Sequence, residues 1–440
     1  MLPVTLPVPA PALPTVAAVP DVLADLEWRG LLAQTTDREA LARDLAAGVV
    51  TVYAGFDPTA DSLHVGSLVP LLALRRFQLA GHRPIALAGG ATGFIGDPTG
   101  RTTDRVMMSA EEISARVVLI KAQLERFLSF DDSATGAILA DNLDWTAPMS
   151  ALDFLRDVGR HFPVNQMLAR ESVSARLDSG GLSFTEMSYQ LLQSLDFVEL
   201  YRRFGCTAQI GGNDQWGNIT AGLDLLRRTE RAGGHALTFP LVTDSAGQKI
   251  GKSTGGGNVW LDPAMTSPYA LWQFCLNVDD RDVGTYLRLL TFVGRAEVEA
   301  LDAEVTDRPA GRAAQRRLAD ELVALVHGAQ EIPRVQAAAA ALFGGGRLED
   351  LDEATLRAAL AEAPSVTVAG ESPPVVELLA EGLGLSRSDA RRAVNEGGAY
   401  LNNVKLTDDA AVPSADDWLH GRFLVLRKGK RNVLVVERVS

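Results

Sequence analysis

The strongest constraint on the fold is an alternation of apolar, strand-like runs with helical patterns between about residues 21 and 240. VVTVYAG precedes LVPLLALRRFQLAG and RPIALAGGATG, and TAQIGGNDQWGN later precedes ITAGLDLLRRTERAG. Such alternation, with glycine at the strand exits, indicates a Rossmann-like, doubly wound parallel α/β sheet. Ligands of these sheets bind beyond the carboxyl ends of the strands. The loops 53–66, 89–101 and 209–218 are therefore expected to border one pocket.

The stretch YAGFDPTADSLHVGSL, residues 53–68, stands where the first strand gives way to a helix. It contains Asp57, Thr59, His64 and Gly66. Strand-to-helix turns gather backbone N–H groups and the positive end of a helix dipole, so they suit phosphates. The same residues could equally serve only to turn the chain. This stretch alone leaves both interpretations open.

The composition is that of a globular protein, since 47% of the 440 residues are hydrophobic and 22% are charged. No run approaches eighteen uninterrupted apolar residues, so no membrane helix is expected. Two cysteines, Cys206 and Cys275, are too few for a disulfide framework or a cysteine-rich metal site, and they favour the cytoplasm. The candidate aspartates lack metal-cluster spacing, so no protein-bound metal is predicted, and magnesium would arrive with a nucleotide.

Charge is unevenly distributed along the chain. The net charge of −13 argues against nucleic acid as a partner of the whole surface. The last twenty residues, however, hold six basic residues against Glu437 alone, a balance of +5. A basic tail can mark a local polyanion site, or it can protect a solvated strand edge from aggregation.

Composition and pattern divide the chain into a proline-rich extension, a Rossmann-like domain, an α-helical domain, a linker and a small α+β domain. Their expected bounds are 1–20, 21–262, 263–345, 346–372 and 373–440. The extension has six prolines and no Lys or Arg, so it is interpreted as disordered rather than as a targeting signal. A mostly helical insertion is expected at about 101–182 within the second segment.

Three motifs could carry chemistry. GQKIGKS is not a phosphate-binding P-loop, because Ala246 stands where glycine is needed and no helix pattern follows; it leaves Lys249 and Lys252 on a glycine-rich segment. Such lysines either solubilise a loop or reach a polyphosphate. In QIGGNDQWGN, a carboxylate at a strand exit, Asp214, could accept ribose hydroxyls.

The third motif, SFTEMSYQLLQSLDF, begins with Ser183 and Glu186 at capping-box spacing, which predicts a helix start. Tyr189, Gln193 and Asp196 then share one helical face. A polar face usually contacts solvent. Alternatively it is a hydrogen-bonding wall of the pocket, offering a phenol, an amide and a carboxylate beside Tyr53.

Together these blocks, in this order, resemble the bacterial tyrosyl-tRNA synthetases. YAGFDPTADSLHVGS is similar to the family's HIGH-type segment and KIGKS to its KMSKS-type loop. GGATGFIGDPTGR, FTEMSYQLLQSLD and QIGGNDQWGNITAG are similar to further family blocks, and the match runs from about Glu27 to the C-terminus. The resemblance implies a class I enzyme that activates tyrosine with ATP and Mg²⁺ to tyrosyl-adenylate and transfers the tyrosyl group to the 3′-terminal adenosine of tyrosine tRNA.

The resemblance also implies roles for individual residues. The tyrosine-binding group, in which Tyr53 and Asp196 flank the phenol hydroxyl, is Tyr53, Asp97, Tyr189, Gln193, Asp196 and Gln215. The ATP-binding group is Gly55, Asp57, Gly66, Ser67, Gly212, Asp214 and Lys252. The catalytic group around the departing pyrophosphate is Thr59, His64, Arg101, Arg105, Lys249 and Lys252.

The implied chemistry needs no general base, because a tyrosine carboxylate is already an anionic nucleophile. It needs alignment and donors where charge grows on the pyrophosphate. Ser67 departs from the family pattern, which often has a second histidine there, and can supply a hydrogen bond but not an imidazole. Arg101 stands where relatives also carry lysine, which keeps the charge but changes the geometry.

The C-terminal segment resembles the small RNA-binding domain named after a small-subunit ribosomal protein. The resemblance implies that it grips the long arm of tyrosine tRNA, that the helical segment faces the anticodon, and that the enzyme is a homodimer. The implied tRNA-binding residues are Arg387, Arg391, Arg392, Arg427, Lys428 and Lys430. Three rival interpretations are a tryptophan-specific synthetase, a synthetase-like RNA-binding protein without activation chemistry, and a nucleotidyltransferase. An indole would not match Tyr53 and Asp196, and a nucleotidyltransferase would not need the RNA-binding segment.

Overall fold

The computed structural model divides into two compact units. The first contains residues up to 265 together with 277–318, and the second contains 266–276 and 319–440. The structure describes residues 19–97, 108–168, 183–241, 243, 245, 247, 257–343, 346–361, 363–429 and 432–439. No helix within these ranges is long and apolar enough to cross a membrane.

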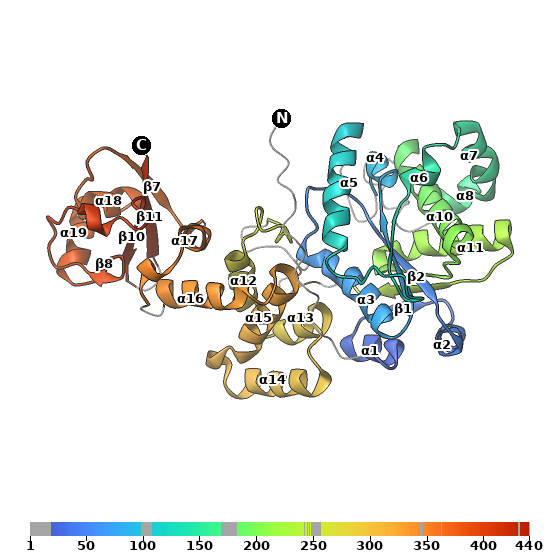
Figure 1. The fold of residues 1–440 in the computed structure, drawn as a ribbon, viewed down its shortest axis with the longest axis horizontal. Helices are drawn as coiled ribbons and strands as arrows, with labels where there is room; N and C mark the ends of the chain where they lie inside the picture. Colours follow the sequence, from blue (N-terminus) through green and yellow to red (C-terminus); the bar gives the residue numbers. More distant parts are fainter. Residues whose placement is uncertain are drawn as a thin grey trace. The chain divides into compact units, whose positions relative to one another are not determined.

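The first unit is built on a six-stranded sheet with the order β1-β6-β5-β2-β3-β4 (Figure 1). Every neighbouring pair is parallel except β1 and β6. The strands are β1 Gln34–Thr35, β2 Thr51–Phe56, β3 Arg83–Ala88, β4 Ile138–Asp141, β5 Ala208–Gly212 and β6 His235–Phe239. The predicted doubly wound parallel sheet is confirmed. Because the chain leaves β2 toward β3 and β5 toward β6, the switch point where ligands bind lies between β2 and β5.

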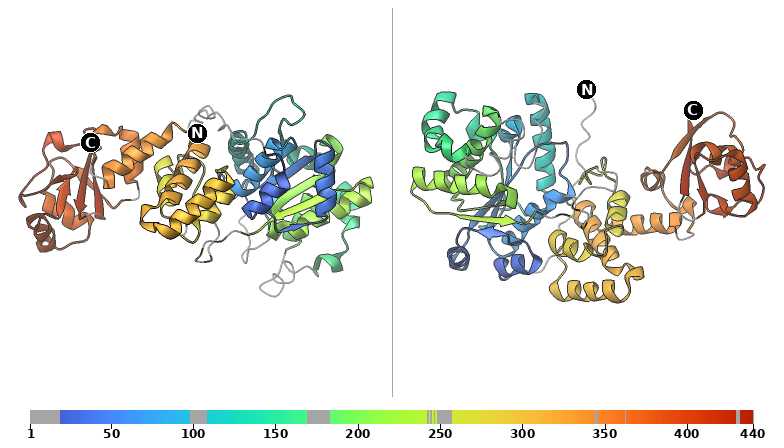
Figure 2. Two further views of the ribbon diagram at one scale, coloured as in Figure 1. Left: turned by 90° about the horizontal axis from the view of Figure 1, so that it is seen from below. Right: turned by 180° about the vertical axis from the view of Figure 1, so that it is seen from behind.

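Helices connect these strands and pack on them. α3 contacts β2 and β3, while α11 contacts β5 and β6. The helices of this region are α1 Val22–Arg29, α2 Arg38–Ala47, α3 Leu68–Leu79, α4 Thr92–Ile95, α5 Ala110–Leu124, α6 Leu143–Thr146, α7 Ala151–Asp157, α8 Val164–Leu168, α10 Phe184–Phe204 and α11 Trp216–Glu230. Figure 2 shows the sheet and its helices from two further directions.

Local signals set the ends of the long helix α10. Ser183 and Glu186 form the predicted capping box, each side chain bonding the other residue's backbone N–H. Gly205 ends the helix in a left-handed conformation (φ 64°), which favours glycine. Between these ends the helix buries both apolar and polar side chains, including Tyr189 and Asp196. A wall of the pocket is therefore anchored at both ends by its own sequence.

Residues 277–318 join the first unit through buried arginines. Arg76 is fully buried, forms an ion pair with Asp25 at 3.2 Å, and donates to the carbonyl of Thr291 at 2.6 Å. Arg29, also paired with Asp25, donates to the carbonyls of Thr291 and Val293. These bonds fix the end of α13 Val283–Leu290 against α1 and α3. The helices that follow are α14 Arg295–Asp307 and α15 Ala313–His327.

The second unit combines helices with a five-stranded sheet of order β7-β11-β10-β8-β9. Its strands are β7 Ser365–Ala369, β8 Ala399–Leu401, β9 Val404–Lys405, β10 Phe423–Lys428 and β11 Asn432–Val439. Its further helices are α12 Pro268–Leu276, α16 Glu331–Phe343, α17 Glu353–Leu360, α18 Val375–Gly382 and α19 Arg387–Asn395. Leu379, Val394 and Leu426 belong to the core between α18, α19 and this sheet. The predicted α+β fold of the C-terminal part is confirmed, and its sheet includes β7, which lies before the predicted start at residue 373. The predicted domain bounds and the separate role of the segment 263–345 stay predictions.

Candidate active site

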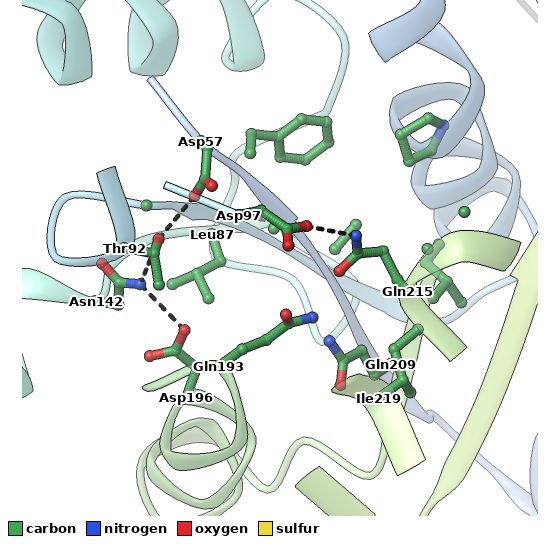
Figure 3. A pocket seen from close by; sticks show the side chains of 18 of the residues that line it. Asp57, Leu87, Thr92, Asp97, Asn142, Gln193, Asp196, Gln209, Gln215 and Ile219 are labelled. Atoms are coloured by element: carbon green, nitrogen blue, oxygen red, sulfur yellow. Dashed lines mark hydrogen bonds between the residues drawn. The ribbon is translucent and has the colours of Figure 1, made fainter. Parts of the chain in front are cut away.

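A pocket of about 330 Å³ lies at the switch point between β2 and β5. Residues from the loops after β2, β3 and β5 meet there, as the sequence predicted, together with the polar face of α10 (Figure 3). The lining residues are Ala54, Gly55, Phe56, Asp57, Thr59, Pro70, Leu87, Gly89, Thr92, Asp97, Asn142, Tyr189, Gln193, Asp196, Gln209, Ile210, Gly211, Gly212, Gln215 and Ile219.

Asp196 is the buried carboxylate of this pocket, with 2% of its surface exposed. Its two oxygens each accept one hydrogen bond, from Asn142 Nδ2 at 3.0 Å and from Trp145 Nε1 at 2.9 Å. Burial raises the pKa of Asp196 to about 7, although the two donors act against this shift. The carboxylate is therefore fixed in direction and close to its ionisation point at neutral pH.

Tyr53 lies on β2 beside this region and is 1% exposed. Its ring meets the edge of Phe197 at a centroid distance of 5.4 Å. Its hydroxyl has no hydrogen-bond partner among the described residues, and the same holds for Gln193 Oε1 and Gln209 Oε1. Burial, and then the charge of Asp196, raise the pKa of Tyr53 well above its ordinary value, so the hydroxyl keeps its proton. Buried polar atoms without partners are rare in proteins and favour a polar ligand.

Two further carboxylates of the pocket are held by neighbouring side chains. Asp57 accepts hydrogen bonds from Thr92 Oγ1 at 2.7 Å and from the Tyr189 hydroxyl at 2.8 Å. Asp97 accepts a hydrogen bond from Gln215 Nε2 at 2.6 Å (Figure 3). Burial, followed by the charge of Asp57, raises the pKa of Tyr189 well above its ordinary value. The pocket lining thus combines oriented carboxylate acceptors with the protonated phenol of Tyr189.

The HIGH-type segment pairs with residues that follow the glycine-rich stretch. His64 forms a β-bridge with Trp260, and their rings meet edge to face at 6.3 Å. The amide of Val65 donates to the carbonyl of Val259 at 2.9 Å. Gly66 and Ser67 form the short helix η1 Val65–Ser67, which leads into α3. Four predicted residues besides Tyr53 therefore lie beside the pocket lining rather than in it: His64, Gly66, Ser67 and Asp214.

Five of the predicted cations lie outside the described residues, namely Arg101, Arg105, Lys249, Lys252 and Lys430.

The sequence did not predict four polar residues of the site: Thr92, Asn142, Trp145 and Gln209. The only local signal for Asn142 was its place directly after a short apolar run, and Gln209 stands in register with Tyr53 on the neighbouring strand.

The predicted RNA-binding arginines lie on α19 and are well exposed. The side chains of Arg387, Arg391 and Arg392 are 76%, 65% and 66% exposed, and they pair with Glu377, Asp409 and Asp389. A hydrogen bond from Ser386, and then the charges of Arg392 and Lys428, lower the pKa of Asp389. Lys428, the last residue of β10, is half-buried.

Arg427 differs from these arginines, because it is only 8% exposed. Its guanidinium donates to Asn403 Oδ1 at 2.9 Å within the small domain. Asn403 in turn donates to the carbonyl of Gly346 at 2.9 Å. Arg427 thus serves packing inside the domain, and it is not part of the exposed basic face.

This geometry defines a doubly wound α/β fold with a polar pocket at its switch point, and family comparisons specify its class. Residues 46–344 match the family model "tRNA synthetases class I (W and Y)". Residues 355–436 match the "Tyrosine--tRNA ligase SYY-like C-terminal domain". The chain belongs to the class I tRNA synthetases and, within them, to the family of the tyrosine–tRNA ligases.

Individual relatives agree with this assignment over nearly the whole chain. The tyrosine–tRNA ligase of Streptomyces coelicolor is 58% identical over 420 residues, which cover 95% of this chain and 99% of that protein. That of Nocardia farcinica is 56% identical over 424 residues with the same coverage. Among solved structures, a C-terminally truncated mitochondrial tyrosyl-tRNA synthetase of Coccidioides posadasii aligns with a TM-score of 0.62 at 33% identity, over 71% of this chain and 90% of that chain. The tryptophanyl-tRNA synthetase of Plasmodium falciparum, at 13% identity and a TM-score of 0.52 over 76% and 87% of the two chains, shares the fold alone.

Proposed function

We propose that this chain is a tyrosine–tRNA ligase that activates L-tyrosine with ATP and transfers the tyrosyl group to tRNA. The observation that carries the proposal is the presence of two complementary polar groups: the oriented Asp196 carboxylate, and the buried Tyr53 hydroxyl, which has no hydrogen-bond partner among the described residues. A phenol can donate to the carboxylate and accept from the hydroxyl at the same time. The family assignment at 58% identity over 95% of the chain supports the same activity.

The remaining pocket residues are assigned to tyrosine and ATP. Asp97, Tyr189 and Gln193 are the proposed contacts of the substrate ammonium, and Gln215 lies near its carboxylate. Gly55, Asp57, Gly66, Ser67, Gly212 and Asp214 are the proposed border of the nucleotide. Thr59 and His64, with the cations Arg101, Arg105, Lys249 and Lys252, are proposed to stabilise the departing pyrophosphate. Supporting this, His64 bridges to Trp260, which follows the lysine-bearing stretch.

Magnesium is proposed to accompany ATP rather than to sit in a protein cage. Asp57, Asp97 and Asp196 already accept hydrogen bonds from neighbouring side chains. Within the part of the chain that the structure describes, no three His, Cys, Asp or Glu side chains are grouped so that they could hold a metal ion. Mg²⁺ usually binds through substrate phosphates with few protein ligands. When bound, the ion neutralises phosphate charge; the protein's residues align the tyrosine carboxylate with the α-phosphate and donate to the leaving group.

Two partner surfaces belong to the proposal. Arg387, Arg391, Arg392 and Lys428 form the proposed tRNA-binding face of the small domain, because arginine and lysine contact phosphates. A second copy of the chain is the proposed partner of an apolar group on α7, α8 and the start of α10. Its exposed members are Leu152, Leu155, Val164, Leu168 and Phe184. Sedimentation of the purified chain, with Leu152→Asp as the disrupting variant, tests the dimer. The cytoplasmic location stays an expectation from composition.

Pyrophosphate exchange into ATP tests the activation step, with tyrosine, phenylalanine and tryptophan each added alone. We expect exchange with tyrosine only. Exchange with tryptophan would reassign the specificity, and silence with all three from folded protein would favour an RNA-binding relative without activation chemistry. Charging of tyrosine tRNA, measured separately, tests the transfer step.

A further inference from the structure

The donors that orient Asp196 both come from one short turn at the end of β4. Asn142 directly follows the strand, and Trp145 lies on α6, which begins at the next residue. Asn142 is held in place by three bonds besides the one to Asp196. Its backbone N–H donates to the carbonyl of Ala88, and its side-chain Oδ1 accepts from the backbone N–H of Ala91 at 2.6 Å. Its Nδ2 also donates to Thr92 Oγ1. The direction of the Asp196 carboxylate therefore depends on the position of this turn.

Asp141 is the last residue of β4 and is only 8% exposed. Its Oδ1 accepts the backbone N–H of Leu143 at 3.0 Å, which closes the turn between the two donors. Its Oδ2 forms an ion pair with Lys121 Nζ on α5 at 3.0 Å. The backbone of Gly90 lies so close that an added Cβ would stand 2.2 Å from Asp141 Oδ1. The carboxylate is thus enclosed between a turn, a glycine and one lysine.

An ion pair between exposed side chains usually contributes little to stability. The pair of Lys121 and Asp141 differs, because Asp141 is buried and directly precedes Asn142 in the chain. Removing the cation would leave an uncompensated buried negative charge, which proteins tolerate poorly. Lys121, with its side chain 31% exposed, meanwhile reaches from the surface of α5.

We propose that Lys121 and Asp141 are a positioning pair for tyrosine specificity. Asp141 holds the turn that aims Asn142 and Trp145 at Asp196, and Lys121 cancels the charge of Asp141 that would otherwise oppose the ionised form of Asp196. Neither residue lines the pocket. The inference rests on the proposed function, in which the Asp196 carboxylate accepts a hydrogen bond from the substrate phenol.

The charges around Asp196 give this pair a measurable effect. Burial is the main cause of its raised pKa, and the negative charges of Asp57 and Asp141 raise it further. Tyr53 on β2 and Tyr189 on α10 also face it, but both keep their protons because burial raises their pKa values. Among these groups, Asp141 is the one whose charge Lys121 neutralises at contact distance. Loss of Lys121 should therefore move the ionisation of Asp196 to higher pH.

The experiment measures KM and kcat for tyrosine, and the tyrosine-to-phenylalanine ratio of kcat/KM, in pyrophosphate exchange from pH 5.5 to 8.5. For Lys121→Met we expect the acid limb of kcat/KM for tyrosine to move up by about one pH unit. KM at pH 6.5 should rise about 3- to 10-fold, with kcat nearly unchanged. Lys121→Arg should behave as the wild type. Arg295→Met, which breaks an exposed ion pair with Glu299, is the matched control for loss of a positive charge.

The double variant Lys121→Met/Asp141→Asn separates charge from packing. If Lys121 acts by neutralising Asp141, the acid limb of the double variant returns close to that of the wild type, and Asp141→Asn alone moves it to lower pH. The proposal is overturned if folded Lys121→Met keeps both the wild-type acid limb of kcat/KM for tyrosine and the wild-type tyrosine-to-phenylalanine ratio of kcat/KM. Should Lys121→Met fail to fold, a wild-type acid limb in Asp141→Asn overturns the proposal in the same way.

Asp196→Asn keeps this inference distinct from the proposed function. If Asp196→Asn lowers the tyrosine-to-phenylalanine ratio while the Lys121 and Asp141 variants change neither ratio nor pH profile, the positioning pair is refuted and the phenol-binding role of Asp196 stands. If Asp196→Asn leaves the ratio unchanged, the proposed role of Asp196 fails first, and the positioning pair falls with it.

Discussion

Replacing Tyr53 with phenylalanine should make the free protein more stable and its substrate selection worse. Tyr53 is 1% exposed, and its hydroxyl has no partner among the described residues. The variant Tyr53→Phe removes this one polar atom and keeps the ring, including its contact with Phe197 at 5.4 Å. It creates no large cavity, so the effect of the hydroxyl is isolated.

The stability change follows from the cost of burying a polar group without a hydrogen bond. That cost is about 1–3 kcal/mol, so the free energy of unfolding of Tyr53→Phe should exceed that of the wild type by this amount. For a unit of this size, 1 kcal/mol corresponds to about 2 °C, and we expect the melting temperature to rise by about 2–6 °C.

The functional change has the opposite sign, because bound tyrosine supplies the partner that the hydroxyl lacks. Loss of one hydrogen bond between neutral groups is worth about 0.5–1.5 kcal/mol. This corresponds to a fall of about 2- to 13-fold in kcat/KM for tyrosine. Phenylalanine cannot make the bond, so its kcat/KM should not fall, and the ratio of the two should shrink by the same factor.

Thermal unfolding without ligands and pyrophosphate exchange with each amino acid measure the two effects. Tyr201→Phe, the same substitution at a half-buried tyrosine of α10, is the control and should change neither. A less stable Tyr53→Phe with an unchanged tyrosine-to-phenylalanine ratio would refute the reasoning, because it would show that the hydroxyl is satisfied inside the protein.

Three further predictions test other parts of the structure. Burial raises the pKa of Asp196 to about 7, so ionisation is disfavoured in the folded state, and the wild type should lose stability as the pH rises from about 4 to about 7. Asp196→Asn has no carboxylate to ionise and should not show this loss. In urea unfolding, the free energy of unfolding of Asp196→Asn should therefore gain up to about 4 kcal/mol on that of the wild type between these two pH values. Free energies that change with pH in parallel for the two proteins would contradict the prediction. Gly90→Ala would place a Cβ 2.2 Å from Asp141 Oδ1 and should cost about 1–3 kcal/mol of stability and raise KM for tyrosine, whereas Gly233→Ala, with no atom within 4 Å, should be neutral in both measurements. Arg391→Ala, at a side chain 65% exposed, should raise KM for tRNA and reduce the salt dependence of tRNA binding by about one unit of slope, with pyrophosphate exchange unaffected; an unchanged salt slope would remove Arg391 from the RNA-binding face.

The sequence predicted those parts of the fold that local signals determine. Ser183 and Glu186 set the start of α10 because a capping box needs only four consecutive residues. The strand β4 was missed because it has four residues, Ile138–Asp141, inside a stretch with helical patterns. Its membership of the sheet depends on pairing with β3, some fifty residues earlier in the chain. Short strands defined by distant partners leave little trace in local periodicity.

The same distinction applies to the site. Asp196 could be placed on a polar helix face from spacing, but its donors could not, because Asn142 and Trp145 lie more than fifty residues away in the chain. Tyr189 was assigned its role through the family resemblance, and its hydroxyl donates to Asp57, which lies 132 positions earlier in the chain. Side-chain direction within a pocket depends on such contacts, which a single sequence does not encode locally.

The proposed specificity then follows from how the fold treats two neighbouring polar groups. Asp196 receives two donors from the protein, which orient a carboxylate that still has lone pairs available. The Tyr53 hydroxyl receives no acceptor from the described residues, so its proton is available to a ligand. A phenol satisfies both groups, because its oxygen accepts a hydrogen bond from Tyr53 while its O–H donates one to Asp196. An indole N–H can donate to Asp196 but has no lone pair for Tyr53, and phenylalanine offers neither a donor to Asp196 nor an acceptor to Tyr53. Selection for tyrosine over both competitors therefore needs only this one donor and one acceptor, provided that the turn behind Asp196 keeps them in place.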